Sequence, residues 1–363
     1  MTDVAAALAF THEATRGRVV FGVGSRRSAA VELDRLGATR PLIIASDFEN
    51  TLAEELTAEL AAHGVAVAGR FRDVVQHVPR AHADDVVAAV TDASADSVIT
   101  IGGGSATGFG KVVRLERDVA FIAVPTTYAG SEMTTIWGRT DGDHKQTGND
   151  PRVKPDTVIY DPELTLGLPA TIAGPSGMNA LAHCVEAMYG PGANPIIGLH
   201  AREGIRALAA GLPRVCSDAD GLDARTEVLY GAFLAGVALA GGGTALHHKT
   251  CHVLGGMFGL DHGAMNAVVL GHALAYNAPA IPQVMESIGA ALGTSGDGAA
   301  DALFDLTVAI GAPHSLEAIG MPADGIDEAA RRVVDEAAAN VRRPEEDGIR
   351  QMLLDAFYGR RPA

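Results

Sequence analysis

The hydrophobic pattern of this 363-residue chain changes at Asp161-Pro162, and this change limits the possible folds more than any other feature. Before it, continuous apolar runs such as residues 97–101 alternate with segments of helical period such as residues 83–93. Strands that alternate with helices predict βαβ units and a parallel sheet. After it, nearly every segment has helical period, which predicts an all-helical region.

We therefore predict an α/β domain over residues 1–162 and an all-α domain over residues 163–363. Two domains agree with the length, because 363 residues exceed what one compact core normally holds. Strands are expected at residues 19–22, 41–47, 65–68, 97–101, 119–124 and 157–161. The clearest helices are expected at residues 28–36, 52–63, 83–93, 196–212, 224–239, 264–275, 284–292, 299–310, 324–340 and 345–357.

The charge of the chain argues against two classes of partner. It carries 28 Lys and Arg against 44 Asp and Glu, a net charge of −16. Such an acidic surface repels phosphate backbones and anionic lipid headgroups, so neither nucleic acid nor a membrane is expected as a partner. No uninterrupted apolar run reaches the roughly 20 residues that span a bilayer.

The cysteines and the N-terminus indicate a cytoplasmic protein. Cys184, Cys216 and Cys251 are widely spaced and form no CxxC pair, which fits reduced thiols. The first ten residues include an apolar run but lack the basic segment of a secretory signal.

A glycine-rich turn directly follows the strand expected at residues 97–101. It consists of Gly102, Gly103, Gly104 and Ser105. Glycines there let the backbone approach a pyrophosphate, and the N–H groups at the start of the next helix complement its charge. The turn matches neither GxGxxG nor a P-loop, so a βα turn without a ligand is the alternative.

Polar residues near the ends of other strands extend this candidate nucleotide site. Thr126, Thr127 and Ser131 line the nucleotide or form an ordinary capped turn. Asp47 is placed to bind ribose hydroxyls, as an acidic residue does in dinucleotide folds, or to cap the next helix. Lys154 contacts the cofactor ribose or is a solvated lysine.

Histidines gather in the second half of the chain. His248 and His252 are four residues apart, so they share one face of a helix, with Lys249 beside them. His262 follows on a short glycine-bounded loop, and His183 lies on an earlier helix. Imidazoles and an ammonium that converge predict either a metal site or a pocket for an anionic substrate.

Asn179 distinguishes these two interpretations. It lies four residues before His183, on the same helical face. With Asp at this position, residue 179, His183, His248 and His262 would suit zinc or iron(II). Because Asn removes the anionic ligand, we predict that no metal is needed; a metal-dependent site would use Asn179 and these three histidines.

Three residues near these histidines are expected to have structural roles. Glu186, on the helix of His183, is expected to orient a helix or bond a backbone group. His247 is expected to face away from His252, behind the site, and Cys251 to pack as a small apolar side chain.

Several motifs occur together in a fixed order: Gly-Gly-Gly-Ser at 102–105, Pro-Thr-Thr at 125–127, Gly-Ser-Glu at 130–132, Asp-Pro at 161–162, Ala-x-x-His-x-x-Glu at 180–186, and His-x-x-x-His at 248–252 with His-Gly at 262–263. In this order they make the chain resemble the iron-containing alcohol dehydrogenase-like superfamily over nearly its whole length. The resemblance implies a Rossmann-like NAD(P)-binding domain and a helical catalytic domain, the dehydroquinate synthase-like fold. It also implies a homodimer, often sharing a strand near the N-terminus.

The chain departs from that family at two positions. Metal-dependent members have an aspartate ligand where Asn179 stands, and an aspartate where Gly108 stands. With Ser-Gly-Met-Asn at 176–179 and His-His-Lys at 247–249, the chain resembles the maleylacetate reductase branch. That branch implies reduction of maleylacetate to 3-oxoadipate with NADH or NADPH, in bacterial breakdown of aromatic compounds and without a metal.

The resemblance implies roles for the cluster. A small dicarboxylate would accept a hydride on its alkene, and His183, His248, His252 and His262 would donate hydrogen bonds to the developing enolate oxygen. His252 would donate the proton, because it matches the family position nearest the nicotinamide. Lys249 would pair with a substrate carboxylate.

Three other functions stay open at this point. They are a metal-dependent alcohol or hydroxy-acid dehydrogenase with Asn179 as a weak ligand, a dehydroquinate synthase-like lyase, and a nucleotide-binding protein without catalysis. The choice between NADH and NADPH is also open, since Asp47 repels a 2′-phosphate while nearby arginines offset it.

Overall fold

The computed structural model describes residues 10–14, 16–142, 144–217 and 221–363. The described residues divide into two compact units, one within residues 16–168 and the other within residues 169–363 together with residues 10–14. The division falls beyond the predicted boundary at residue 162. The Asp161 carboxylate explains this, because it accepts hydrogen bonds from the backbone N–H groups of Gly24 and Arg26 and so ties the segment after the last strand to the α/β unit.

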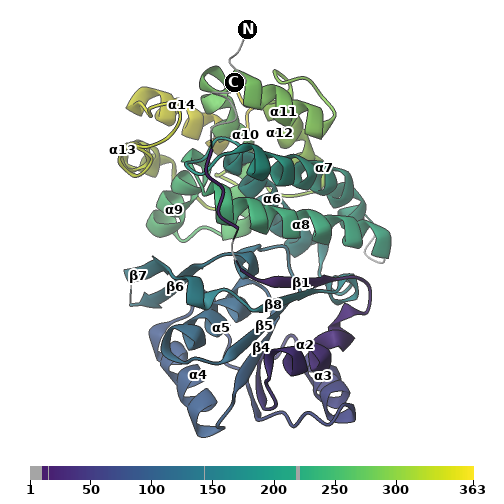
Figure 1. Ribbon diagram of the computed structural model, residues 1–363. Helices are drawn as coiled ribbons and strands as arrows, with labels where there is room; N and C mark the ends of the chain where they lie inside the picture. The colour runs from purple at the N-terminus through teal and green to yellow at the C-terminus, as the bar shows by residue number, and fades with distance from the viewer. Residues whose placement is uncertain (1–9, 15, 143, 218–220) are drawn as a thin grey trace. The chain divides into compact units, whose positions relative to one another are not determined.

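The α/β unit contains a six-stranded sheet in the order β1-β8-β5-β4-β2-β3, and all of its strand pairs are parallel (Figure 1). Its strands are β1 (Arg18–Phe21), β2 (Pro41–Ile44), β3 (Gly69–Phe71), β4 (Ser97–Gly102), β5 (Ala120–Pro125) and β8 (Thr157–Tyr160). The helices between them are α2 (Ala29–Leu36), α3 (Asn50–Ala62), α4 (Arg80–Asp92) and α5 (Gly104–Glu116). The predicted parallel sheet is confirmed, and its central strands are fully buried, as continuous apolar runs require.

Two details of this unit differ from the prediction. The third strand lies at Gly69–Phe71 instead of residues 65–68. An antiparallel hairpin of β6 (Ile136–Asp141) and β7 (His144–Asn149) was not predicted. Apart from the adjacent Ile136 and Trp137, its strands consist of polar residues and glycine and have no continuous apolar face, so they carry little strand signal.

The second unit is helical throughout the part that the structure describes. Its helices are α6 (Ala170–Ala187), α7 (Pro195–Ser217), α8 (Leu222–Gly242), α9 (Leu246–Phe258), α10 (His262–Asn277), α11 (Pro282–Leu292), α12 (Ala299–Ala309), α13 (Ile326–Glu336) and α14 (Glu346–Phe357). Helix α6 is almost entirely buried and packs against α7, α8 and α10, while α9 packs against α10 and α13. Residues of α6, α9 and α10 therefore meet inside this unit.

Within the described residues, no single helix is both long and apolar enough to span a membrane. Only α8 and α9, taken together as a pair bent by 96°, meet the length and composition of a span.

Candidate active site

The glycine-rich turn and the predicted threonines meet at the carboxyl ends of β4 and β5. Gly102 pairs with Pro125 in the sheet, and its carbonyl accepts a hydrogen bond from the Thr126 N–H at 3.1 Å. A Cβ on Gly103 would lie 2.9 Å from Oγ1 of Thr127, closer than Cβ atoms approach other atoms. Glycine at position 103 therefore lets the turn and the β5 end lie against each other.

Helix α5 begins within this turn, at Gly104, and includes Ser105. No side chain of the described residues caps its first turn. The backbone N–H groups there are thus available to an anion, and a diphosphate is the group that such a glycine-rich helix start binds. The residues at the turn fit the nucleotide that the sequence implies.

Asp47 and Ser131 follow β2 and β5, the two strands that flank β4 in the sheet. Asp47 follows β2, which pairs with β4; its side chain is 81% exposed and lies 3.6 Å from Nη1 of Arg72. Ser131 follows β5, and its carbonyl accepts a hydrogen bond from Nζ of Lys111 at 2.7 Å. Arg72 is therefore an arginine close to Asp47.

Lys154 is not brought into this group by its backbone position. It precedes β8, at the amino end of the parallel strands, whereas the glycine turn lies at their carboxyl ends. Its side chain is buried, and a Cβ on Gly17 would lie 3.3 Å from its Nζ. Burial lowers the pKa of Lys154.

The structure gives a local reason for Gly108, where the sequence departs from the family. A Cβ at this position would lie 2.7 Å from Cγ2 of Val78. Val78 is buried and has a φ of 50°, which is unusual for a β-branched residue. An aspartate at position 108 would require Val78 to move.

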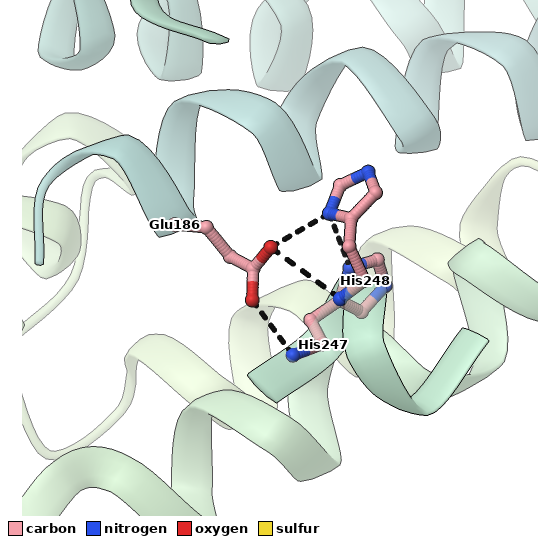
Figure 2. A group of neighbouring side chains, drawn as sticks. All are labelled: Glu186, His247 and His248. Carbon is pink, nitrogen blue, oxygen red and sulfur yellow. Dashed lines mark hydrogen bonds and ion pairs between the residues drawn. The ribbon is translucent and has the colours of Figure 1, made fainter. Parts of the chain in front are cut away.

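In the helical unit, a buried glutamate of α6 contacts two histidines of α9 (Figure 2). One carboxylate oxygen of Glu186, Oε1, accepts a hydrogen bond from the backbone N–H of His247 at 2.7 Å. The other, Oε2, lies 2.6 Å from Nδ1 of His248 and 3.4 Å from the backbone nitrogen of the same residue. Glu186 therefore holds the first turn of α9, whose N-cap residue, Ala245, makes no side-chain cap.

This contact explains part of what the sequence predicted. The expected structural role of Glu186, bonding backbone groups, is present in the structure. His247 is fully buried behind His248, with its Nδ1 3.2 Å from Nδ1 of His248. Cys251 is buried and lies 3.7 Å from Nε2 of His247, as a small packing residue does.

The predicted catalytic histidines form a stacked group. The rings of His183 and His248 are stacked with centroids 4.7 Å apart, and the His252 ring lies edge-on at 6.4 Å from His248. Burial lowers the pKa of both His183 and His248 well below the usual value, so both are neutral near pH 7. His252 and His262 are exposed, and His262 is close enough to affect the titration of the buried pair.

Three buried polar atoms of this group have no hydrogen-bond partner among the described residues. They are Oδ1 of Asn179, Nδ1 of His183 and Nε2 of His248. Buried polar groups in proteins are nearly always satisfied, so such a set marks a place where a ligand or water binds. Lys249 lies at the edge, 3.9 Å from Oε2 of Glu336 in a pair of partly exposed groups.

Two sets of side chains are candidate ligands for a metal ion. Ligand atoms of Glu186, His247 and His248 lie within 4.8 Å of one another, close enough to hold an ion. The Glu186 oxygens, however, already accept three N–H groups, which a metal would have to displace. The second set, Asn179 with the histidines, is neutral and offers no carboxylate for a divalent transition metal.

Comparison with known proteins identifies relatives of the whole chain. Residues 16–162 match the family model described as "Iron-containing alcohol dehydrogenase", and residues 173–357 match "Fe-containing alcohol dehydrogenase family, C-terminal". The chain is 46% identical over 355 residues to the maleylacetate reductase of Burkholderia cepacia, covering 98% of this chain and 99% of that protein. It is 44% identical to the maleylacetate reductase of Sphingobium indicum, covering 97% and 99%.

Solved structures give the same result. The maleylacetate reductase of Rhizobium sp. strain MTP-10005 superposes with a TM-score of 0.93 at 40% identity, covering 98% of this chain and 99% of that one. The maleylacetate reductase of Agrobacterium tumefaciens superposes with a TM-score of 0.91 at 42% identity and the same coverage. The fold is also that of the 1,3-propanediol oxidoreductase structure, with a TM-score of 0.89 at 26% identity.

Proposed function

The chain belongs to the iron-containing alcohol dehydrogenase family, and we propose that it reduces the carbon–carbon double bond of maleylacetate to give 3-oxoadipate. The observation that carries this proposal is the near-full-length similarity to several maleylacetate reductases, at 40–47% identity. The reaction belongs to the breakdown of aromatic compounds, and the chain is an oxidoreductase.

NADH or NADPH is the reductant in this proposal. The glycine-rich turn at Gly102–Gly104 and the uncapped start of α5 support binding of its diphosphate. When bound, the dinucleotide supplies a hydride to the alkene carbon farther from the ketone, and the resulting enolate takes up one proton to give the saturated product.

The chain's own residues then have two tasks: to stabilise the enolate oxygen and to deliver the proton. We assign both to the histidine cluster, because preorganised hydrogen-bond donors replace a metal at a developing oxyanion. His252 delivers the proton. Because its side chain is exposed, it can regain a proton from solvent after each turnover.

Lys249 is assigned to a substrate carboxylate. Its ion pair with the exposed Glu336, at 3.9 Å, is weak, so exchanging that partner for a substrate carboxylate costs little. A local cation is needed because the net charge of −16 repels a dianionic substrate.

We propose that the reaction does not require a transition metal. Two observations support this: position 179 carries a neutral amide, and the nearby Glu186 carboxylate is engaged by N–H groups. Were an ion bound, Asn179, His183, His248 and His262 would hold it, and it would polarise the ketone oxygen. The family is named for iron, and a turnover assay with and without metal separates these cases.

We further propose a cytoplasmic homodimer. β1 is an edge strand of the sheet, and Phe21 and Val23 at its end are 36% and 54% exposed. An edge strand with exposed apolar residues favours pairing with a second copy. Sedimentation equilibrium should give twice the chain mass, and a monomer would overturn this part of the proposal.

The first experiment is a turnover assay with metal-stripped protein. Freshly generated maleylacetate and NADH are mixed with the protein, with and without added zinc or iron, and NADH oxidation is followed by absorbance. Fast turnover without metal is the expected result. Turnover only after metal addition would retain the substrate and overturn the metal-free mechanism, and no turnover in either condition would overturn the proposed function.

A further inference from the structure

We propose that Glu186 is a positioning residue that fixes the tautomer of His248, keeping the proton on Nδ1 and leaving Nε2 as a bare acceptor in the site. This inference rests on the proposed function for its catalytic meaning, but its structural part is independent of the substrate. A chain of hydrogen bonds runs from Asn266 through His247 and His248 to Glu186. Figure 2 shows its last three residues.

The chain starts at the backbone carbonyl of Asn266. Nε2 of His247 lies 3.0 Å from this oxygen, which accepts hydrogen bonds but cannot donate them. Nε2 of His247 must therefore carry a proton. The ring is fully buried, which favours the neutral imidazole with one proton, so its other nitrogen, Nδ1, is bare.

The proton of the neutral His248 ring is on Nδ1. Its Nδ1 lies 3.2 Å from the bare Nδ1 of His247 and 2.6 Å from Oε2 of Glu186. A bare Nδ1 on His248 would place three lone pairs against one another, so this nitrogen carries the proton and donates it to the carboxylate. The neutral ring then has a bare Nε2.

Glu186 is held so that it can only accept. Oε1 accepts the backbone N–H of His247, and the nitrogens of His248 approach Oε2. Because each of these contacts comes from a nitrogen that carries a proton, the carboxylate acts only as an acceptor. The carboxylate thus sets the orientation and the tautomer of the imidazole together, as carboxylates do for functional histidines in other proteins.

This tautomer determines what the other nitrogen of the His248 ring, Nε2, can do. Nε2 of His248 is buried and has no hydrogen-bond partner among the described residues. In this tautomer Nε2 accepts a hydrogen bond from a donor group of the bound reactants or from water. It does not donate a hydrogen bond to the enolate oxygen. The donor role then falls to the other histidines, His252 first.

The test is the variant Glu186→Gln in protein labelled with ¹⁵N-histidine. The amide keeps the shape of the side chain, but its NH₂ group can face Nδ1 of His248 and reverse the tautomer. We expect the ¹⁵N spectrum of His248, assigned with His248→Gln, to change from the Nδ1–H form to the Nε2–H form. An unchanged His248 tautomer in a folded variant would overturn the proposal.

Kinetics separate positioning from a merely structural effect. We expect Glu186→Gln to lower kcat by about 10- to 100-fold, the range seen when a partner behind a ligand histidine is lost, with NADH affinity unchanged. In a His248→Gln background, adding Glu186→Gln should have no further effect on kcat. Effects that multiply would show that Glu186 acts independently of His248 and would overturn the proposal.

A matched control is available in the other unit. Glu32 is a buried carboxylate held by Arg18, Arg35 and Thr157, and Glu32→Gln should leave the His248 spectrum and kcat unchanged. The spectrum is recorded without substrate. If the tautomer reverses but maleylacetate is not reduced by the wild-type protein, the positioning role stands and the proposed substrate fails.

Discussion

Each unit contains a glutamate that is buried against a cluster of polar groups, and the two clusters differ in one informative way. In the α/β unit, Glu132 is 1% exposed and accepts a hydrogen bond from the Tyr160 hydroxyl at 2.6 Å. In the helical unit, Glu186 is 0% exposed and contacts His247 and His248. Both carboxylates have raised pKa values because of burial.

The cluster of Glu132 is saturated. Lys111, also fully buried, donates its three protons to the Ser131 carbonyl, the Thr134 hydroxyl and the Ile136 carbonyl at 2.6–2.9 Å. Burial lowers its pKa to about 7, and attraction to Glu132 opposes that shift. This ammonium therefore has no proton left for a ligand, and its role is to hold the segment after β5.

The cluster of Glu186 is unsaturated. Both oxygens of Glu186 and both ring nitrogens of His247 have partners, but Nε2 of His248, Nδ1 of His183 and Oδ1 of Asn179 lack partners among the described residues. A saturated network stabilises a fold, whereas a network that ends in unpaired buried atoms identifies a binding site. The following predictions test this contrast, from the largest expected effect to the smallest.

Lys111→Met should destabilise the protein most. It leaves two carbonyls and a hydroxyl unpaired and removes the cation near Glu132, a loss of about 3–5 kcal/mol. Urea unfolding measures it, with Arg331→Met as the control, because Arg331 forms exposed ion pairs with Glu328 and Glu346 that contribute little. Equal stability of the two variants would contradict the idea that the Lys111 cluster is structural.

His252→Ala should lower kcat by about 10²–10³ with little change in stability, since it removes a donor from the unsaturated cluster. Stopped-flow or steady-state kinetics with maleylacetate measure this. His200→Ala, on α7, is the control and should behave as wild type, because its Nδ1 bonds only the helix backbone at Ile196. Full activity of His252→Ala would remove it from the mechanism.

The stability should fall as the pH falls below about 6.5. Burial holds the pKa of His247 at about 3, so the unfolded chain takes up a proton that the folded protein excludes. Between these two pKa values the free energy of unfolding should decrease by about 1.4 kcal/mol per pH unit for this residue. His183 and His248, whose pKa values are also lowered, add to the slope.

Urea unfolding at pH 7.5, 6 and 5 checks this prediction. A His247→Gln variant should show a slope smaller by about one proton, because the titrating ring is gone. Stability that does not vary over this range would contradict the burial of neutral imidazoles.

Lys249→Ala should have the smallest effect, raising KM for maleylacetate by about fivefold without changing kcat, as expected for a partly exposed ion pair worth about 1 kcal/mol. Glu336→Gln is the opposing control, because it releases Lys249 and should leave KM equal or lower. A KM that is unchanged in Lys249→Ala would assign the substrate carboxylate to another residue.

Much of the fold could be predicted because it depends on local patterns. The alternation of apolar strands and amphipathic helices before Asp161 defined the parallel sheet, and most helices of the second unit lie within a few residues of the predicted ranges. The hairpin of β6 and β7 was missed because it has no apolar face. The unit boundary moved because Asp161 bonds Gly24 and Arg26, far away in sequence.

The parts of the candidate site that depend on spacing within one helix could also be predicted. Spacing of four residues placed Asn179 with His183 on α6 and His248 with His252 on α9, which helix geometry alone dictates. The position of Lys154 was not predictable in this way, because which end of a strand a residue occupies depends on where the strand begins in the sheet.

The sequence by itself determined the fold class, the glycine turn and the histidine faces, since each follows from the period of a strand or helix. Only the tertiary structure decided that Glu186 meets His247 and His248, at sequence separations of 61 and 62 residues. It also decided that all three protons of the Lys111 ammonium have hydrogen-bond partners, whereas Nε2 of His248 has none among the described residues. Hydrogen bonds between helices depend on how the helices pack, and the local sequence pattern of one helix does not predict which residues of another helix it meets.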